Sequence, residues 1–238
     1  MLYSLPERLP AVWIALVIAG FVAWMYLKFT GKNDPIAIAV KDRVSGVVLA
    51  YIFFSKFVGG LVLHPSLNWS EDILSMLGGS ATDGWPIGVL AAILYLMYGL
   101  RKSKVLGRRA FVSTAEGVVS GSILLFAYLA VVNLDPFRLE YILRAFGACL
   151  LLMLIRRYRR QPNIYPQRLW AAFGILLFLT SVLVPHTTVF IVFRPSQWFY
   201  IAIIVVSLIA EGVSDFKGTS ESQNADLSQD DHIEHDFD

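Results

Sequence analysis

Residues 111–132 read FVSTAEGVVSGSILLFAYLAVV, a run of 22 residues that contains a single charged side chain, Glu116. An α-helix rises about 1.5 Å per residue, so a helix of this length crosses the hydrocarbon layer of a bilayer, which is about 30 Å thick. A run this apolar is typical of a transmembrane helix.

Six further apolar segments occur along the chain. The other predicted transmembrane segments are 11–28, 44–63, 85–100, 139–155, 169–185 and 197–213. The composition agrees, because 56% of the 238 residues are hydrophobic and only 16% are charged, whereas about 25% of the residues of a soluble domain are charged. We therefore expect an all-α integral membrane protein with seven transmembrane helices.

Lysine and arginine alternate between the loops of this topology. The loops after the first, third and fifth segments are rich in cations, whereas loops 64–84, 133–138 and 186–196 contain only Arg138 and Arg194. Cationic loops stay on the cytoplasmic side of a membrane. The pattern predicts an outside N-terminus and a cytoplasmic C-terminus, and it explains the basic excess without nucleic-acid binding.

The charge also divides the chain into two parts. Residues 1–214 carry 19 Lys and Arg against 10 Asp and Glu, whereas residues 215–238 carry 8 acids and one lysine. The tail has too few apolar residues to form a core, so we expect a disordered cytoplasmic tail, whose partner the sequence does not identify. The single cysteine, Cys149, excludes an intrachain disulfide, and we expect neither a metal site nor a cofactor.

Ionisable side chains inside the predicted helices cost several kcal/mol unless they are paired. Lys56 lies about 13 residues into the second segment, and Arg144 lies one turn into the fifth, four residues after Glu140. The spacing of Glu140 and Arg144 allows an ion pair on one helix face. Two alternatives stay open: both cations pair with carboxylates of the protein, or Lys56 and Arg144 face a shared cavity and bind an anionic headgroup.

Two features of local structure are also expected. Asp42 is placed to favour the N-terminus of the second helix. Gly117 and Gly121, with Ser113 and Ala127, form a small-residue face suited to close helix packing.

Several spaced motifs follow one another along residues 11–210. They are Asp42 and Lys56 fourteen residues apart, Glu116 and Asn133 seventeen apart, LGGSATDG at 77–84, PFRLEY at 136–141, and Arg194-x-x-Gln197. In this order they resemble the prolipoprotein diacylglyceryl transferases. The resemblance implies a multi-pass protein of the bacterial cell membrane that moves the diacylglyceryl group of phosphatidylglycerol onto a prolipoprotein cysteine.

The resemblance also implies roles for particular residues. Lys56, Asn133, Glu140 and Arg144 are the candidate lipid-binding residues, and Asp83 is the candidate catalytic base. Asp83 stands where the family has a histidine, and an aspartate acts as a base near neutral pH only where burial raises its pKa. The family's Gly-Arg pair and its late arginine stretch are replaced here by Leu129-Ala130 and Val184-Pro185-His186.

Three hypotheses follow. The first is a phosphatidylglycerol-dependent diacylglyceryl transferase. The second is a catalytically inactive relative that binds lipid or lipoprotein, with the acidic tail recruiting a cytoplasmic partner. The third, a small unrelated transporter, is disfavoured because the chain has neither inverted repeats nor paired broken helices.

Overall fold

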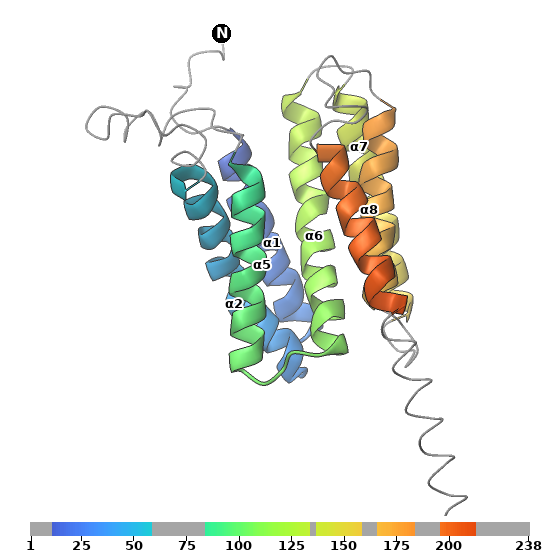
Figure 1. The fold of residues 1–238 in the computed structure, drawn as a ribbon. Coiled ribbons are helices and arrows are strands. Elements are labelled where there is room, and N and C mark those ends of the chain that lie inside the picture. Colours follow the sequence, from blue (N-terminus) through green and yellow to red (C-terminus); the bar gives the residue numbers. More distant parts are fainter. Residues whose placement is uncertain (1–10, 59–83, 134–136, 159–165, 184–195, 213–238) are drawn as a thin grey trace, which may run out of the picture.

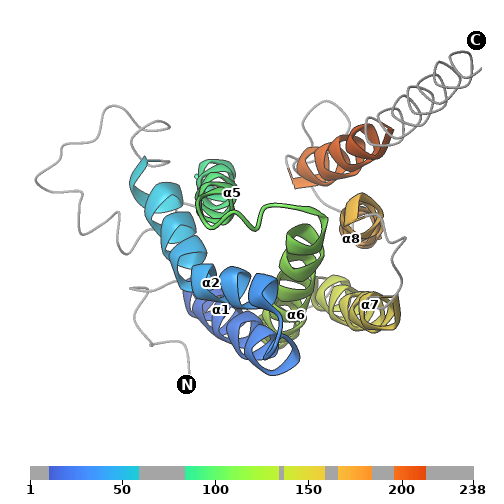
Figure 2. The same cartoon turned by 90° about the horizontal axis from the view of Figure 1, so that it is seen from below.

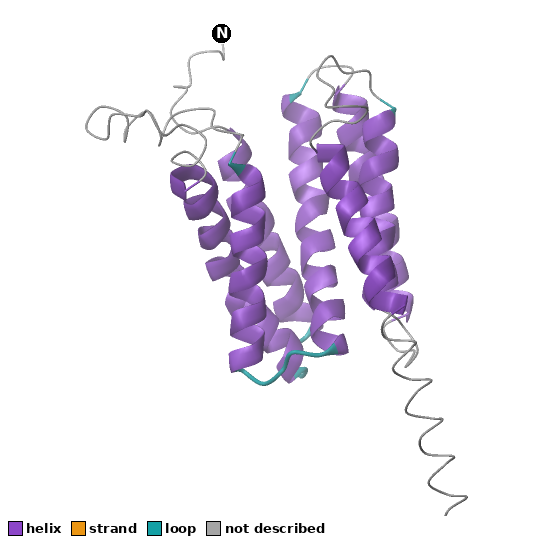
Figure 3. Ribbon diagram, in the orientation of Figure 1, coloured by secondary structure: helices purple, strands orange, loops and turns teal. Residues whose placement is uncertain are grey.

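A computed structural model describes residues 11–58, 84–133, 137–158, 166–183 and 196–212, and all regular structure among these residues is helical (Figure 3). The helices are α1 (Ala11–Thr30), α2 (Pro35–Phe53) with the π-helical turn η1 (Phe54–Val58), α5 (Trp85–Lys102), α6 (Arg108–Val132), α7 (Phe137–Tyr158), α8 (Pro166–Val182) and Ser196–Gly212. Each of the seven predicted apolar segments overlaps one of them. The all-α prediction is therefore confirmed for the described part of the chain.

The helices run alternately up and down in a bundle (Figure 1). Helix α6 packs against α1 and α7 and also contacts α2 and α8, while α2 packs against α1 and α5. The view along the bundle shows α1, α2 and α5 on one side of α6, and α7, α8 and Ser196–Gly212 on the other (Figure 2). Helix α6 thus joins the two halves of the molecule.

The start of α2 differs from the expectation. The helix begins at Pro35, and the side chain of Asp34 caps it by accepting a hydrogen bond from the backbone N–H of Ile36 at 2.9 Å. Asp42 instead lies on the second turn, exposed and 3.2 Å from the ammonium of Lys41. The prediction that Asp42 marks the helix start was wrong, because an Asp-Pro pair is both a cap and a first helical residue.

The small-residue face of α6 packs closely against α1. A Cβ atom added to Gly121 would lie 2.7 Å from the carbonyl oxygen of Ala19. Gly117 and Ser113 are buried on the same helix, whereas Ala127 is exposed. The predicted packing face is confirmed for the first three residues and was wrong for Ala127.

Apolar side chains fill the bundle and also cover its outside. One buried cluster joins α6, α7 and α8, and a second joins α1, α2, α5 and α6. Large side chains on the outside stay exposed, including Val131 at 80%, Phe29 at 71% and Tyr98 at 69%. By length and composition, Trp13–Thr30 of α1 and Arg108–Val132 are long and apolar enough to cross a membrane, while Pro166–Val182 and Ser196–Gly212 are apolar but shorter.

Candidate functional site

Glu140 and Arg144 form an ion pair on the first turns of α7, as the four-residue spacing predicted. Both side chains are buried, with 4% of Glu140 and 6% of Arg144 exposed. The Nε–H of Arg144 donates a hydrogen bond to Oγ1 of Thr180 on α8 at 3.1 Å. The guanidinium therefore links α7 to α8 and is neutralised by a carboxylate of its own helix.

Three aromatic rings surround the same guanidinium. Its Cζ atom lies 5.6 Å from the ring centroids of Tyr141 and Tyr200, and 5.8 Å from that of Phe126. These distances are within the range of favourable cation–π contacts. Because Phe126 lies on α6 and Tyr200 lies on Ser196–Gly212, the Arg144 cluster joins four helices.

A second polar contact lies beside this cluster. Nε2 of Gln197 donates a hydrogen bond to Oγ of Ser181 at 3.1 Å, and both residues are buried. Ser181 follows Thr180 in sequence, so adjacent residues of α8 hold Arg144 and the start of Ser196–Gly212. Thr180, Ser181 and Tyr200 were not among the predicted site residues, although two consecutive hydroxyl residues late in an apolar segment were a signal for such a contact.

Lys56 occupies a different part of the bundle. It lies on the π-helical turn η1 after α2, its side chain is only 5% exposed, and its Nζ atom lies 5.1 Å from the centroid of the Trp13 ring on α1. Helix α5 closes the opposite side, since a Cβ atom on Gly88 would lie 2.7 Å from Cβ of Ser55. A π-helical turn inside or at the end of an α-helix is frequent at functional sites.

Lys56 and Arg144 have different neighbours. The ring beside Lys56 belongs to α1, whereas the described partners of Arg144 belong to α6, α7, α8 and Ser196–Gly212. The described contacts thus form two separate clusters, and none of them joins the two cations across a common cavity.

The remaining predicted site residues are Asn133 and Asp83. Asn133 caps the end of α6, and its Nδ2 donates a hydrogen bond to the carbonyl oxygen of Leu129 at 2.8 Å. This contact is local to α6. Asp83 lies outside the described residues, although the next residue, Gly84, is buried at the N-terminus of α5.

An apolar groove of about 210 Å³ runs between α1, α2, α5 and α6. Its polar lining residues include Thr114 and Ser122, whose hydroxyls donate hydrogen bonds to backbone carbonyls of α6. Leu16, which lines the groove on α1, lies one helical turn from Trp13 and so from the Lys56 ammonium. The groove is further lined by residues such as Ala23, Val44, Val48, Leu96 and Leu125.

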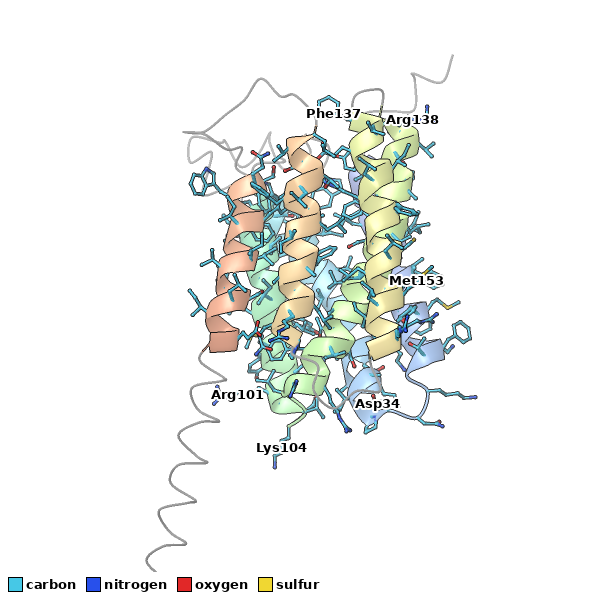
Figure 4. The ribbon with its side chains drawn as sticks, turned by 90° about the vertical axis from the view of Figure 1, so that its right-hand side faces the viewer. Asp34, Arg101, Lys104, Phe137, Arg138 and Met153 are labelled. Atoms are coloured by element: carbon cyan, nitrogen blue, oxygen red, sulfur yellow. The ribbon has the colours of Figure 1, made fainter. Side chains whose placement is uncertain are left out.

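Charge is distributed unequally between the two ends of the bundle. Figure 4 labels Phe137 and Arg138 at one end, and Asp34, Arg101 and Lys104 at the other. We call the second end the basic end. Its cations are Lys28, Lys32, Lys41, Arg43, Arg101, Lys102, Lys104, Arg108, Arg109, Arg156, Arg157 and Arg168.

The opposite half of the bundle has few cations among the described residues: Lys56, Arg138 and Arg144. The described residues contain no group of three or more His, Cys, Asp or Glu side chains suited to hold a metal ion. No protein-family model, curated protein or solved structure matches the chain.

Proposed function

We propose that this protein is an integral membrane protein with seven transmembrane helices, an outside N-terminus and a cytoplasmic C-terminus, in the plasma membrane of a bacterium. The separation of charge along the bundle supports this proposal. Twelve cations gather at the basic end and three lie in the opposite half, which is the distribution that the positive-inside rule requires of a multi-pass protein.

The side surface of the bundle supports the same proposal. Exposed apolar residues lie on helices of both halves, including Leu49 on α2, Met153 on α7 and Val206 on Ser196–Gly212. Soluble monomers rarely expose continuous apolar surface of this extent. Lipid is the solvent that such a surface prefers.

Cysteine labelling tests the topology. In a Cys149→Ser background, a membrane-impermeant thiol reagent added to intact cells should label Ser196→Cys, at the end opposite the basic end, and should not label Ser103→Cys in the turn after α5. Permeabilised cells provide the control, because both cysteines should then react. Labelling of Ser103→Cys in intact cells would contradict the seven-helix orientation.

We further propose that the protein binds phosphatidylglycerol, with Lys56 holding the phosphate. The observation that carries this proposal is the position of Lys56, a buried ammonium on a π-helical turn beside the start of an apolar groove. A phosphate oxygen on Nζ forms a charge-assisted hydrogen bond, which is about twice as strong as a neutral one. An acyl chain of the same lipid matches the apolar lining of the groove.

Arg144 has a secondary role in this proposal. Glu140 neutralises its charge, but within the described residues Nη1 of Arg144 donates no hydrogen bond. A lipid oxygen in this half of the bundle can accept from that group without removing the ion pair. Arg144 thus contributes a hydrogen bond, whereas Lys56 contributes net charge.

Native mass spectrometry tests the lipid proposal. Lys56→Met should lower the retention of phosphatidylglycerol roughly tenfold, equivalent to about 1.4 kcal/mol, while Lys56→Arg should largely preserve it. Lys32→Met, at the exposed basic end, is the matched control and should retain the lipid. Equal retention by the wild type and Lys56→Met would refute the role of Lys56.

Diacylglyceryl transfer is a second candidate, favoured by one observation. Gly84, directly after Asp83, is buried at the same end of the bundle as Glu140. In the transfer reaction a lipoprotein cysteine loses its thiol proton to the Asp83 carboxylate, and its sulfur forms a bond to the glyceryl carbon. The bond from that carbon to the phosphate oxygen breaks, and glycerol phosphate leaves.

Complementation separates transfer from binding alone. A bacterium depleted of its own prolipoprotein diacylglyceryl transferase should grow with the wild-type chain and not with Asp83→Ala if the chain is an enzyme. Growth with both chains would show that Asp83 is not the base. Failure of both, with membrane-inserted protein and retained phosphatidylglycerol, would show a lipid-binding protein without transferase activity.

A further inference from the structure

The turn after α5 is the most basic part of the described chain. Residues 101–109 contain five cations, and all five are exposed: Arg101, Lys102, Lys104, Arg108 and Arg109. We call this segment the basic turn. Like charges this close repel one another unless an anion lies between them.

The backbone of the basic turn has one unusual residue. Lys104 has φ of 54°, in the left-handed region that favours glycine. Its N–H donates to the carbonyl of Arg101, and the N–H of Val105 donates to the carbonyl of Leu100, which is the pattern of a helix C-cap that most often contains glycine at this position. A lysine here adds charge at a position where glycine fits the backbone better.

The acidic end of the chain begins at the same end of the bundle. Ser196–Gly212 ends at the basic end (Figure 1). Its last acid, Glu211, already accepts a hydrogen bond from Nε of Arg168 at 2.5 Å. The acidic series of the sequence thus starts with a carboxylate that is paired with a cation of the basic end.

Helix α5 and Ser196–Gly212 also lie close together. The rings of Trp85 and Phe199, near their opposite ends, pack edge to face with centroids 5.0 Å apart. The basic turn follows α5 directly, and residues 213–238 follow Gly212. The 18 residues from Gly212 to Asp230 reach at most about 60 Å, which exceeds several helix spacings of about 10 Å each.

We propose that the acidic segment 215–238 binds the basic turn 101–109 of the same chain. Eight acids and one lysine of the segment face five cations of the turn, and the covalent tether gives the contact a high effective concentration. The segment then acts as an electrostatic cover that other anions must displace. This proposal is independent of lipid binding at Lys56.

Zero-length carbodiimide cross-linking tests the contact, because it joins a lysine amine only to a carboxylate in direct contact. The full chain is placed in nanodiscs of zwitterionic lipid, and the products are mapped by mass spectrometry. We expect links from Lys102 and Lys104 to acids of 215–238 at low salt, and about a tenfold loss at 0.5 M salt because the charges are exposed. The Lys41–Asp42 pair, at 3.2 Å, is the internal positive control.

Two variants and an isotope mixture make the test specific. Replacing Arg101, Arg108 and Arg109 by glutamine keeps both lysines and should lower the yield of the links several-fold. Arg138→Gln, at the other end, should leave it unchanged. In a mixture of ¹⁴N and ¹⁵N chains, the links should join residues of the same isotope.

Three results would overturn the proposal. They are the absence of these links at low salt while the Lys41–Asp42 control reacts, links that persist in the triple arginine variant, and links that join different isotopes. None of these outcomes depends on phosphatidylglycerol binding. Loss of the links only in nanodiscs with anionic lipid would support the cover and identify the membrane surface as its competitor.

Discussion

Arg144 and Lys56 are both buried cations in the half of the bundle opposite the basic end, yet their surroundings differ. Arg144 has a carboxylate four residues before it, a hydroxyl acceptor on α8 and three aromatic rings. Lys56 lies on a π-helical turn with the Trp13 ring over its ammonium, beside an apolar groove. The difference indicates that Arg144 holds helices together, whereas Lys56 is placed to meet a ligand.

The largest expected effect concerns the Glu140–Arg144 pair. Glu140→Gln leaves the guanidinium buried without its counter-charge and should lower the free energy of unfolding by about 3 kcal/mol. Thermal unfolding in detergent measures this change. The double variant Glu140→Gln, Arg144→Met should lose less than the sum of the single variants by at least about 1 kcal/mol; additive losses would show that the two residues do not couple.

A smaller effect is expected at Gly88, which supports the Lys56 turn. A Cβ atom there would lie 2.7 Å from Cβ of Ser55 and 2.8 Å from the carbonyl oxygen of Tyr51, so Gly88→Ala should cost about 2 kcal/mol. It should also lower phosphatidylglycerol retention, because Lys56 follows Ser55 on the turn. Gly107→Ala, with nothing within 4 Å of its Cβ, should leave both quantities unchanged; loss of stability with full lipid retention would separate the turn from binding.

Thr180→Val tests how α8 holds Arg144. The variant keeps the shape of the side chain and removes the acceptor of the Arg144 Nε–H, so we expect a loss of about 1.5 kcal/mol. Thr114→Val is the matched control, because the Thr114 hydroxyl donates only to the carbonyl of Ala110 in its own helix. Equal losses in the two variants would show that the contact with Arg144 adds nothing.

The smallest effect is expected for Lys56→Met, and it most directly tests the comparison with Arg144. Methionine keeps the length of the side chain, and losing the ring contact is offset by removing a buried charge. The free energy of unfolding should therefore change by less than about 1 kcal/mol. If Lys56→Met is as destabilising as Arg144→Met, Lys56 is a structural counter-ion and the ligand-binding role is wrong.

The Glu140–Arg144 pair shows how much of a site local spacing can predict. Two opposite charges four residues apart on one helix meet regardless of the surrounding fold, and the structure confirms this pair. Thr180 and Tyr200 lie 36 and 56 positions after Arg144, so their contacts with it depend on how α8 and Ser196–Gly212 pack. No local pattern contains that information.

The start of α2 shows a different limit. The apolar segment was expected from residue 44, because charged Lys41, Asp42 and Arg43 precede it. The helix begins at Pro35 instead, since charged residues continue a helix readily and the cap at Asp34 determines its start. Hydropathy thus locates an apolar run and does not locate the end of a helix.

The sequence by itself determined the all-helical class, the seven helices and the concentration of cations at one end, because these depend on apolar runs, helical rise and charge counts along the chain. Tertiary structure alone decided that Lys56 lies against Trp13, that Arg144 is held by four helices, and that an apolar groove begins beside Lys56. Each of these contacts joins residues on different helices. Their formation depends on which helix faces meet, and that is determined by side-chain packing across the whole bundle rather than by any local segment.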